Sequence, residues 1–447
     1  MLLNFIPKFS QNIFYNLYQK SFVLKNLDWL IFINIILLIL TSTLAQSDTI
    51  SYFAIFAIIL TAVKILVKPN ERFSLSTADI WLLLYFIFVL ISVAGSTLFY
   101  LSFKGFCKTL IYLGFYISFI HYLKDNRSKL KYIIIAMAFS AFAESLIALK
   151  QNFISVSEIS GWQDMSRLNP EQVMTRVYGS LKPYNPNLFG GYMVSILPTT
   201  LILMFLPLIN KHYKTAICGA LCFILSAVTI IMTGCRGAYL ALFAQLCLVM
   251  VLTYKFLKPT YKKLFLIVST CFATLSVLFI LSKASIRTRI LSIFAMRSDS
   301  SNSFRFNVYN SCVDMFKDNW LLGIGVGNQN FREIYGLYMK TGFDALSAYN
   351  IYLETAVESG IFALLAFLGF ISINLVKSIK YIFKRNNTNS IYLLIAVISL
   401  VGILVHGFVD TVFFRPQIQF VFWIMIGIIR VVSEPRFGRS GYVKKRN

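Results

Sequence analysis

The sequence predicts an all-α, polytopic membrane protein. Of its 447 residues, 57% are hydrophobic and only 13% are charged, which is too apolar for a soluble domain. Runs of Leu, Ile, Phe and Val recur that are long enough to cross a hydrocarbon core of ~30 Å as helices, which satisfy their own backbone groups in lipid. We therefore expect about twelve transmembrane helices and a large extracytoplasmic loop.

The order of these parts follows from the positions of the apolar runs. At the N-terminus, apolar residues alternate with Lys and Asn, which predicts an amphipathic helix on the cytoplasmic membrane surface and not a cleaved signal peptide. The predicted parts are the surface helix at 1–26, nine spans in 27–281 with an outer loop at 151–187, the large outer loop at 282–350, three spans in 351–432 and a basic cytoplasmic tail at 433–447.

Lysine and arginine are distributed unequally between the two sets of connections. One set carries clusters such as the four lysines in 255–263, whereas the short connections of the other set carry only Lys104, Arg236 and Arg415. Because cytoplasmic loops are rich in Lys and Arg, both termini are predicted to be cytoplasmic and both long loops to face outward. The same rule accounts for most of the formal net charge of +24, which argues against nucleic-acid binding as its cause.

Four arginines stand on the predicted outer side, against this trend: Arg176, Arg236, Arg305 and Arg415. Arginine presents a planar fork of donors that suits phosphate and diphosphate groups. Glycines flank Arg236 in TGCRGAY, so the backbone can approach whatever its guanidinium binds. These residues are candidate diphosphate ligands, and contacts with lipid headgroups or with the protein surface are the alternative.

Two segments of the large loop add to this candidate site. The segment SNSFRFNVYN predicts a helix capped by Ser301 or Ser303, and a helix start close to Arg305 attracts anions. The segment LLGIGVGNQNF has no preceding strand, so its spacing is not that of a dinucleotide-binding fingerprint. We expect a tight turn at Gly323, Gly325 and Gly327 that either presents backbone N–H groups to a ligand or is a turn alone.

Ionisable residues that could move a proton lie near the last outer turns. In YNIYLETAVESG, Tyr349 precedes Glu354 and Glu358, which are four apart and share one helix face. Carboxylates at membrane depth are costly and point to function, although pairing with an outer arginine is equally open. In HGFVDTVFFRPQ, His406 and Asp410 are also four apart on one helix face, which predicts a proton acceptor with an orienting carboxylate. A structural hydrogen bond of His406 is the alternative.

The cysteines do not indicate a metal site. All seven occur singly, and none joins His or carboxylates at metal-ligand spacing. We read them as small core residues. No metal and no cofactor is expected.

Arg236, Arg305, the GIGVG turn and YNIYLETAVESG together resemble the O-antigen ligase and polymerase superfamily of membrane glycosyltransferases, over about residues 185–370. The resemblance implies a glycosyltransferase C-like membrane fold, with an SRG-like arginine at a helix start, an arginine in the large loop and an HN-x-YL-x-x-x-x-E-x-G element. The segments TRVYGSLKPYNPNLFGGY, TGFDALSAYNIYLE and HGFVDTVFFRPQ look similar to a subgroup named for inorganic carbon (bicarbonate) transport in cyanobacteria.

The superfamily implies a metal-independent transferase of cell-envelope polysaccharide biosynthesis in the bacterial inner membrane. It would move a glycan from a polyprenyl-diphosphate donor of the undecaprenyl type to an acceptor sugar or lipid, with the arginines on the diphosphate and Glu354, Glu358 or His406 as proton acceptor. Tyr349 stands where the superfamily has a histidine, and a tyrosine of pKa ~10 is a poor base at neutral pH. Bicarbonate transport, or an accessory role in it, is the alternative, and a structural or assembly role is a third.

Overall fold

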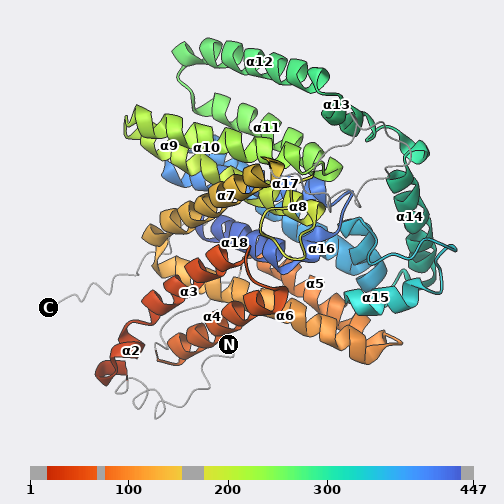
Figure 1. Ribbon diagram of the computed structural model, residues 1–447. Helices are drawn as coiled ribbons and strands as arrows, with labels where there is room; N and C mark the ends of the chain where they lie inside the picture. The colour runs from red at the N-terminus through yellow and green to blue at the C-terminus, as the bar shows by residue number, and fades with distance from the viewer. Residues whose placement is uncertain (1–17, 68–75, 154–175, 434–447) are drawn as a thin grey trace.

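The computed structural model describes residues 18–67, 76–153 and 176–433. All the regular secondary structure in these ranges is helical (Figure 1). The predicted all-α fold is therefore confirmed. The expected surface helix at 1–26 lies mostly outside the described residues. Its described end contains the short helix α2 (Phe22–Lys25). The basic tail lies outside them from residue 434 onward, as does most of the expected outer loop at 151–187.

Twelve apolar helical segments run through the described part of the chain. Ten are long and apolar enough to cross a membrane, whereas α3 and α18 are shorter, with 15 and 17 residues. The segments are α3 (Leu27–Thr41), α4 (Ser47–Val67), α5 (Thr77–Gly95), α6 (Phe99–Asp125), η2 (Arg127–Lys129) with α7 (Leu130–Phe153), α8 (Pro186–Ile196) continued by η6 (Leu197–Thr200) and α9 (Leu201–Ile209), α10 (Tyr213–Met232), α11 (Arg236–Phe256), α12 (Pro259–Ser282), α16 (Ile351–Lys384), α17 (Thr388–His406) and α18 (Pro416–Val432).

The expected large loop is itself mostly helical. Asp299, and not Ser301 or Ser303, caps its longest helix, because the Asp299 side chain accepts a hydrogen bond of 2.9 Å from the Asn302 amide. Aspartate is as good an N-cap as serine, and its position one turn earlier lengthens the helix. The elements of this loop are α13 (Ala284–Leu291), η7 (Met296–Ser298), α14 (Ser300–Asn319) and α15 (Asn328–Tyr335).

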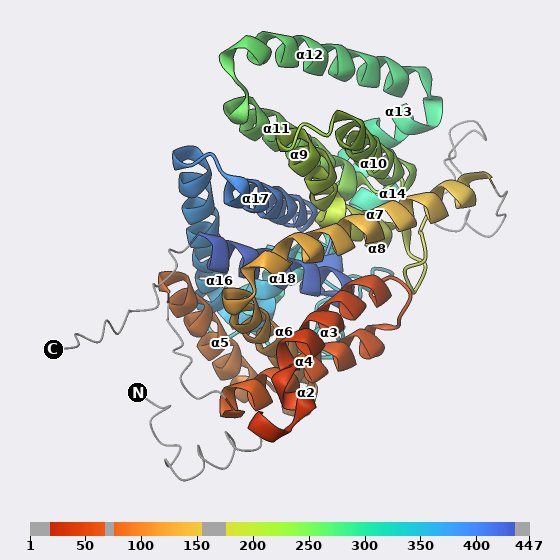
Figure 2. The same ribbon diagram turned by 90° about the vertical axis from the view of Figure 1, so that its left-hand side faces the viewer.

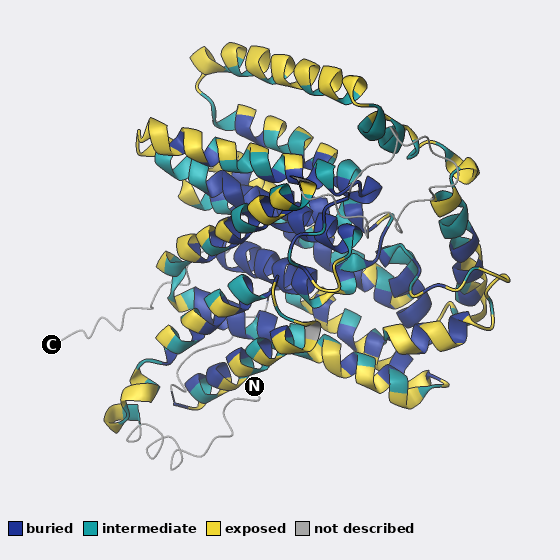
Figure 3. Ribbon diagram, in the orientation of Figure 1, coloured by how far each residue is buried: buried dark blue, intermediate teal, exposed yellow. Residues whose placement is uncertain are grey.

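Burial differs strongly between the helices. All the residues of α18 after Pro416, and most of those of α17, are buried at the centre of the bundle (Figure 3). By contrast, α12 has no buried residue and stands apart from the other helices in both views (Figures 1 and 2). An apolar helix that is exposed on all sides is expected to be covered by lipid.

Helix α16 is interrupted at Gly360, where φ is 78°. A Cβ at this position would lie 2.2 Å from the Leu321 carbonyl oxygen, so only glycine fits. The Ile361 amide donates to the Trp320 carbonyl at 2.9 Å, so the chain that follows α14 docks at the break. The break separates residues 351–359, which are mostly buried, from the longer apolar part of the helix.

Candidate functional site

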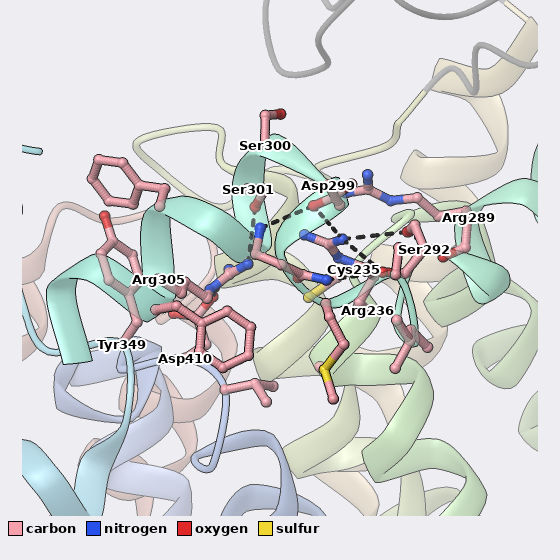
Figure 4. Close-up of a pocket in the computed structure, with 18 of the residues that line it drawn as sticks. Cys235, Arg236, Arg289, Ser292, Asp299, Ser300, Ser301, Arg305, Tyr349 and Asp410 are labelled. Atoms are coloured by element: carbon pink, nitrogen blue, oxygen red, sulfur yellow. Dashed lines mark hydrogen bonds and ion pairs between the residues drawn. The ribbon is translucent and has the colours of Figure 1, made fainter. Parts of the chain in front are cut away.

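A cavity of about 750 Å³ lies at one end of the bundle, where α11 and α14 begin (Figure 4). The lysines at 211–214 lie at the start of α10, and those at 255–263 lie at and after the end of α11. These are the helix ends far from the cavity. The cavity is therefore at the end of the bundle that the charge pattern assigns to the outer side. Among the described residues, its charged lining consists of Arg176, Arg236, Arg289, Arg305, Asp299 and Asp410.

Arg236 is the first residue of α11, and it is 8% exposed. Its Nη1 donates to Asp299 Oδ1 at 2.8 Å and lies 3.3 Å from Ser292 Oγ. Its Nη2 is buried and has no hydrogen-bond partner among the described residues. Leaving a buried charged donor unsatisfied costs free energy, so this N–H group is available to an anionic ligand.

Arg305 lies on α14 on the other side of the cavity, beside Tyr349 and Asp410 (Figure 4). Its Nη1 donates to Ser301 Oγ at 3.0 Å, and its Nη2 lies 3.8 Å from Asp410 Oδ2. The guanidinium is 5.5 Å from the centre of the Tyr349 ring, within the range of a cation–π contact. Its Nε is buried and, like Nη2 of Arg236, has no hydrogen-bond partner in the described part of the chain.

Arg176 and Arg289 complete the positive lining. Arg176 is held rigidly, because its Nε donates to the Thr233 carbonyl at 2.8 Å and its Nη2 to Asn187 Oδ1 at 2.6 Å. The Nε of Arg289 donates to the Gly234 carbonyl at 2.7 Å. Arg289 was not among the four predicted arginines, although it also breaks the charge trend as an arginine in the predicted outer loop.

The arginines crowd positive charge into the cavity. Burial, followed by the charges of Arg176 and Arg236, lowers the pKa of Arg289 to about 10. Burial also lowers the pKa of Arg176. Burial raises the pKa of Asp299, but the hydrogen bonds from Arg236 and the Asn302 amide outweigh it and hold this pKa below its ordinary value. Four arginines and two carboxylates leave a formal excess of two positive charges, which favours an anionic ligand.

Tyr349 lines the cavity in a left-handed backbone conformation, with φ of 51°. Its carbonyl accepts a hydrogen bond of 3.1 Å from the Tyr309 hydroxyl. Burial, and then the charge of Asp410, raises the pKa of the Tyr349 hydroxyl above its ordinary value. The hydroxyl therefore keeps its proton at neutral pH, in agreement with the expectation that it is a poor base.

Glu354 and Glu358 are buried, but neither is among the described residues that line the cavity. Glu354 Oε2 accepts a hydrogen bond of 2.9 Å from the Ala348 amide, and Glu358 Oε1 accepts one of 3.0 Å from the Gly327 amide. Glu354 thus binds the backbone of the segment before α16, and Glu358 binds the backbone of the glycine turn.

The predicted glycine turn is present, with positive φ at Gly323, Gly325 and Gly327. The Gly325 amide lies 2.9 Å from the Glu358 carbonyl and 3.1 Å from Ser92 Oγ on α5. The turn therefore packs between α5 and α16, and its amides bind protein groups. These contacts correspond to the turn-geometry alternative.

The last outer turn separates His406 from Asp410. Helix α17 ends at His406, and Asp410 lies in the turn before η8 (Val412–Phe414). The prediction that the two side chains share one helix face is wrong, because the helix stops at Gly407. Asp410 lines the cavity, whereas Arg415, which caps α18, is not among its described lining residues.

His406 faces Cys235 behind the wall of the cavity, with Nε2 and Sγ 3.5 Å apart. Cys235 and Cys312 are buried, as expected of small core residues. No group of three or more His, Cys, Asp or Glu that could hold a metal ion occurs in the described ranges. The expected core position is wrong for four cysteines, which are exposed on apolar helices: Cys107, Cys218, Cys247 and Cys271.

Comparison with known families gives a match that covers part of the site and leaves Arg176 and Asp410 outside it. Residues 221–368 match the family model described as O-antigen ligase. This segment contains Arg236, Arg289 and Arg305, together with Tyr349 and the glycine turn. The match supports the expected O-antigen ligase and polymerase superfamily, while the bicarbonate-transport subgroup stays a prediction. A search of curated proteins gives no match.

Proposed function

We propose that the protein is a membrane glycosyltransferase of the O-antigen ligase or polymerase type. It moves a glycan from a polyprenyl-diphosphate donor to an acceptor sugar or lipid on the outer face of the bacterial inner membrane. The observation that carries the proposal is the convergence of four guanidinium groups on one cavity, three of them within the segment that matches the O-antigen ligase family.

The arginines have the chemistry that glycan transfer from a diphosphate requires. The acceptor hydroxyl attacks C1 of the donor sugar, the bond from C1 to the diphosphate oxygen breaks, and the polyprenyl diphosphate leaves with the electron pair. Fixed cationic donors stabilise the negative charge that develops on the leaving group. Arg236 and Arg305 each offer a buried N–H group for this purpose, and the starts of α11 and α14 add their positive dipole ends.

Roles within the cavity follow from position. Arg236 and Arg305 bind the diphosphate directly, and Arg176 and Arg289 add charge from fixed positions. Arg289 takes the role that the sequence assigned to Arg415, which lies outside the described lining. The catalytic roles expected of Glu354, Glu358 and His406 stay predictions. None of these three residues is part of the cavity lining, so the cavity itself does not support those roles.

The size and charge of the cavity favour a donor with several anionic groups over bicarbonate. A volume of about 750 Å³ falls in the range of pockets that enclose drug-sized ligands. A bicarbonate ion carries one charge and would engage a small part of this lining. A diphosphate carries more than one charge and can contact arginines on both sides of the cavity.

Arginine-to-lysine variants test the proposal, since lysine keeps the charge and loses the two-pronged fork. We expect Arg236→Lys and Arg305→Lys each to lower glycan transfer by about 10²–10³-fold. The readouts are the surface glycan ladder on gels and the binding of undecaprenyl diphosphate to the purified protein. Arg332→Ala, on the exposed side of α15, is the control with unchanged transfer. Loss of bicarbonate uptake with an intact glycan ladder would contradict the proposal.

A further inference from the structure

The two carboxylates of the cavity differ in how they are bound. The Asp299 carboxylate is ion-paired at close range, because its Oδ1 accepts from Arg236 at 2.8 Å and, as the cap of α14, from the Asn302 amide at 2.9 Å. Asp410 uses Oδ1 for the amides of its own turn, at 2.8 Å from Thr411 and 3.3 Å from Val412. Among the described residues, the charged group that faces its Oδ2 is Arg305, at 3.8 Å.

This distance is longer than a hydrogen bond. Oδ2 of Asp410 is therefore an oriented carboxylate oxygen that the described protein groups do not bind closely. The two amide bonds to Oδ1 fix the direction of the carboxylate, and the side chain is 8% exposed in a wall of the cavity. In Figure 4, Asp410 lies with Arg305 and Tyr349 on one side of the cavity, whereas Asp299 lies with Arg236 and Arg289 on the other.

The other groups near Asp410 are less suited to accept a proton from a ligand. Tyr349 is protonated at neutral pH, and His406 faces the Cys235 sulfur at 3.5 Å. Glu354 is bound by the Ala348 amide outside the described lining. Asp410 is thus the carboxylate of the described cavity lining that combines a fixed orientation with the absence of a cation at hydrogen-bond distance, whereas Asp299 is paired with Arg236 at 2.8 Å.

We propose that Asp410 is the general base that accepts the proton of the acceptor hydroxyl, an inference that rests on the proposed transferase function. Asp410 Oδ2 takes the proton while the acceptor oxygen forms its bond to C1 of the donor sugar. The bond between C1 and the diphosphate breaks, and the diphosphate leaves with the electron pair towards Arg236 and Arg305. Arg305 lies next to Asp410 and also binds the diphosphate, so it is close to both the base and the leaving group.

Asp410→Asn tests this role, because Asn Oδ1 still accepts from the Thr411 and Val412 amides while the basic carboxylate is lost. Transfer is measured in right-side-out membrane vesicles that carry the endogenous donor, and binding is measured with undecaprenyl diphosphate on the purified variants. We expect transfer to fall by about 10²–10⁴-fold, with undecaprenyl diphosphate bound at least as tightly as by the wild type. Asp410→Glu keeps the carboxylate and is expected to retain more activity than Asp410→Asn.

Two variants control for damage to the fold. Thr411 lies in the same turn as Asp410, and Thr411→Val removes the hydrogen bond from Thr411 Oγ1 to Ser347 Oγ. This variant is expected to keep most of the activity. Asp314→Asn changes an exposed carboxylate on α14 and should leave transfer unchanged. The inference is overturned if Asp410→Asn keeps more than a tenth of the wild-type transfer rate. It is also overturned if Thr411→Val lowers the transfer rate as much as Asp410→Asn does. A wild-type protein that neither binds undecaprenyl diphosphate nor transfers glycan would overturn the proposed function as well.

Discussion

Arg236 at the start of α11 and Asp299 at the cap of α14 form an ion pair, with Nη1 and Oδ1 2.8 Å apart. The pair joins the helical bundle to the large loop on one side of the cavity. Asp299 thus occupies one edge of the guanidinium that we assign to the diphosphate. An incoming anion competes with this carboxylate for Arg236.

Asp299→Asn should therefore tighten anion binding. Asparagine is as good an N-cap as aspartate, so α14 keeps its start, while the competing negative charge is removed. We expect the Kd of undecaprenyl diphosphate to fall about tenfold, or ~1.4 kcal/mol, as measured by titration calorimetry in detergent. Asp299→Ala, which also loses the cap, should cost ~1 kcal/mol of stability. An unchanged Kd in Asp299→Asn would show that the carboxylate does not compete.

Arg289→Gln should stabilise the empty protein and weaken its binding of the anion. The pKa of Arg289 is lowered to about 10, because burial and the charges of Arg176 and Arg236 disfavour its charged form. The unfolded chain holds this proton more tightly than the folded protein, so the charged group costs stability at all pH values below about 10. The cost declines as the pH rises through 10.

The measurement for Arg289→Gln is thermal unfolding in detergent at pH 8 and at pH 10.5. We expect roughly 1–3 kcal/mol of added stability at pH 8, since one pKa unit corresponds to ~1.4 kcal/mol, and a smaller gain at pH 10.5. Arg287→Gln, which changes an exposed arginine two residues earlier, should have little effect. A lower Tm for Arg289→Gln at pH 8 would mean that its hydrogen bond to Gly234 outweighs the charge crowding.

Glu354→Gln and Glu358→Gln separate a catalytic from a backbone-binding role. Both carboxylates accept from backbone amides, at 2.9 Å from Ala348 and 3.0 Å from Gly327. A glutamine side-chain oxygen can accept the same bonds, so we expect each variant to keep glycan transfer within about threefold. The corresponding alanine substitutions should destabilise the protein by ~1–3 kcal/mol, because a buried amide loses its partner. A 100-fold loss of transfer in either glutamine variant would restore the catalytic role.

The apolar runs and the lysine pattern were enough to predict the helical fold and the end of the bundle that carries the site. Arg176, Arg236 and Arg305 could be found because each violates the charge trend. Their convergence could not be derived from the sequence, since it depends on how the helices of the large loop return over the bundle. The assignment of Arg415 failed to match the cavity lining for the same reason.

The proton-transfer residues show a different limit of the sequence. Spacing of four predicts a common helix face only if the helix continues, and α17 ends at His406. The end of α17 directs Asp410 into the cavity and leaves His406 against Cys235. Glu358 and the glycine turn are adjacent in space, yet no sequence pattern indicates that one binds the other.

Chelation of divalent metals is expected to leave glycan transfer intact. Four arginines already supply positive charge where the diphosphate is proposed to bind, so a metal ion is not needed to neutralise it. Transfer in membrane vesicles should stay within about twofold of its starting rate after EDTA treatment, with added magnesium or manganese as the comparison. A loss that either metal restores would contradict charge stabilisation by arginine alone.

Gly325 and Gly342 form a matched pair for testing the glycine turn. Both have positive φ, at 97° and 86°, so alanine is strained at either position. A Cβ at Gly325 would lie 2.5 Å from Ser96 Oγ and from Ser102 Oγ, whereas a Cβ at Gly342 meets nothing within 4 Å. The Ser96 Cβ would lie 2.6 Å away and moves only with its backbone, so the clash must displace the backbone of the turn or of the end of α5.

Gly342→Ala should thus cost only the backbone strain, on the order of 1 kcal/mol. Gly325→Ala should cost roughly 2–4 kcal/mol, because overpacking adds to that strain. Thermal unfolding of the purified variants measures the difference, and glycan transfer by the surviving folded protein reports on the site. Because the turn binds Glu358 in the part of α16 before its break, and Tyr349 lies next to the N-cap of that helix, displacement of the turn is also expected to lower transfer. Equal unfolding temperatures for the two variants would show that the turn is not packed tightly against α5.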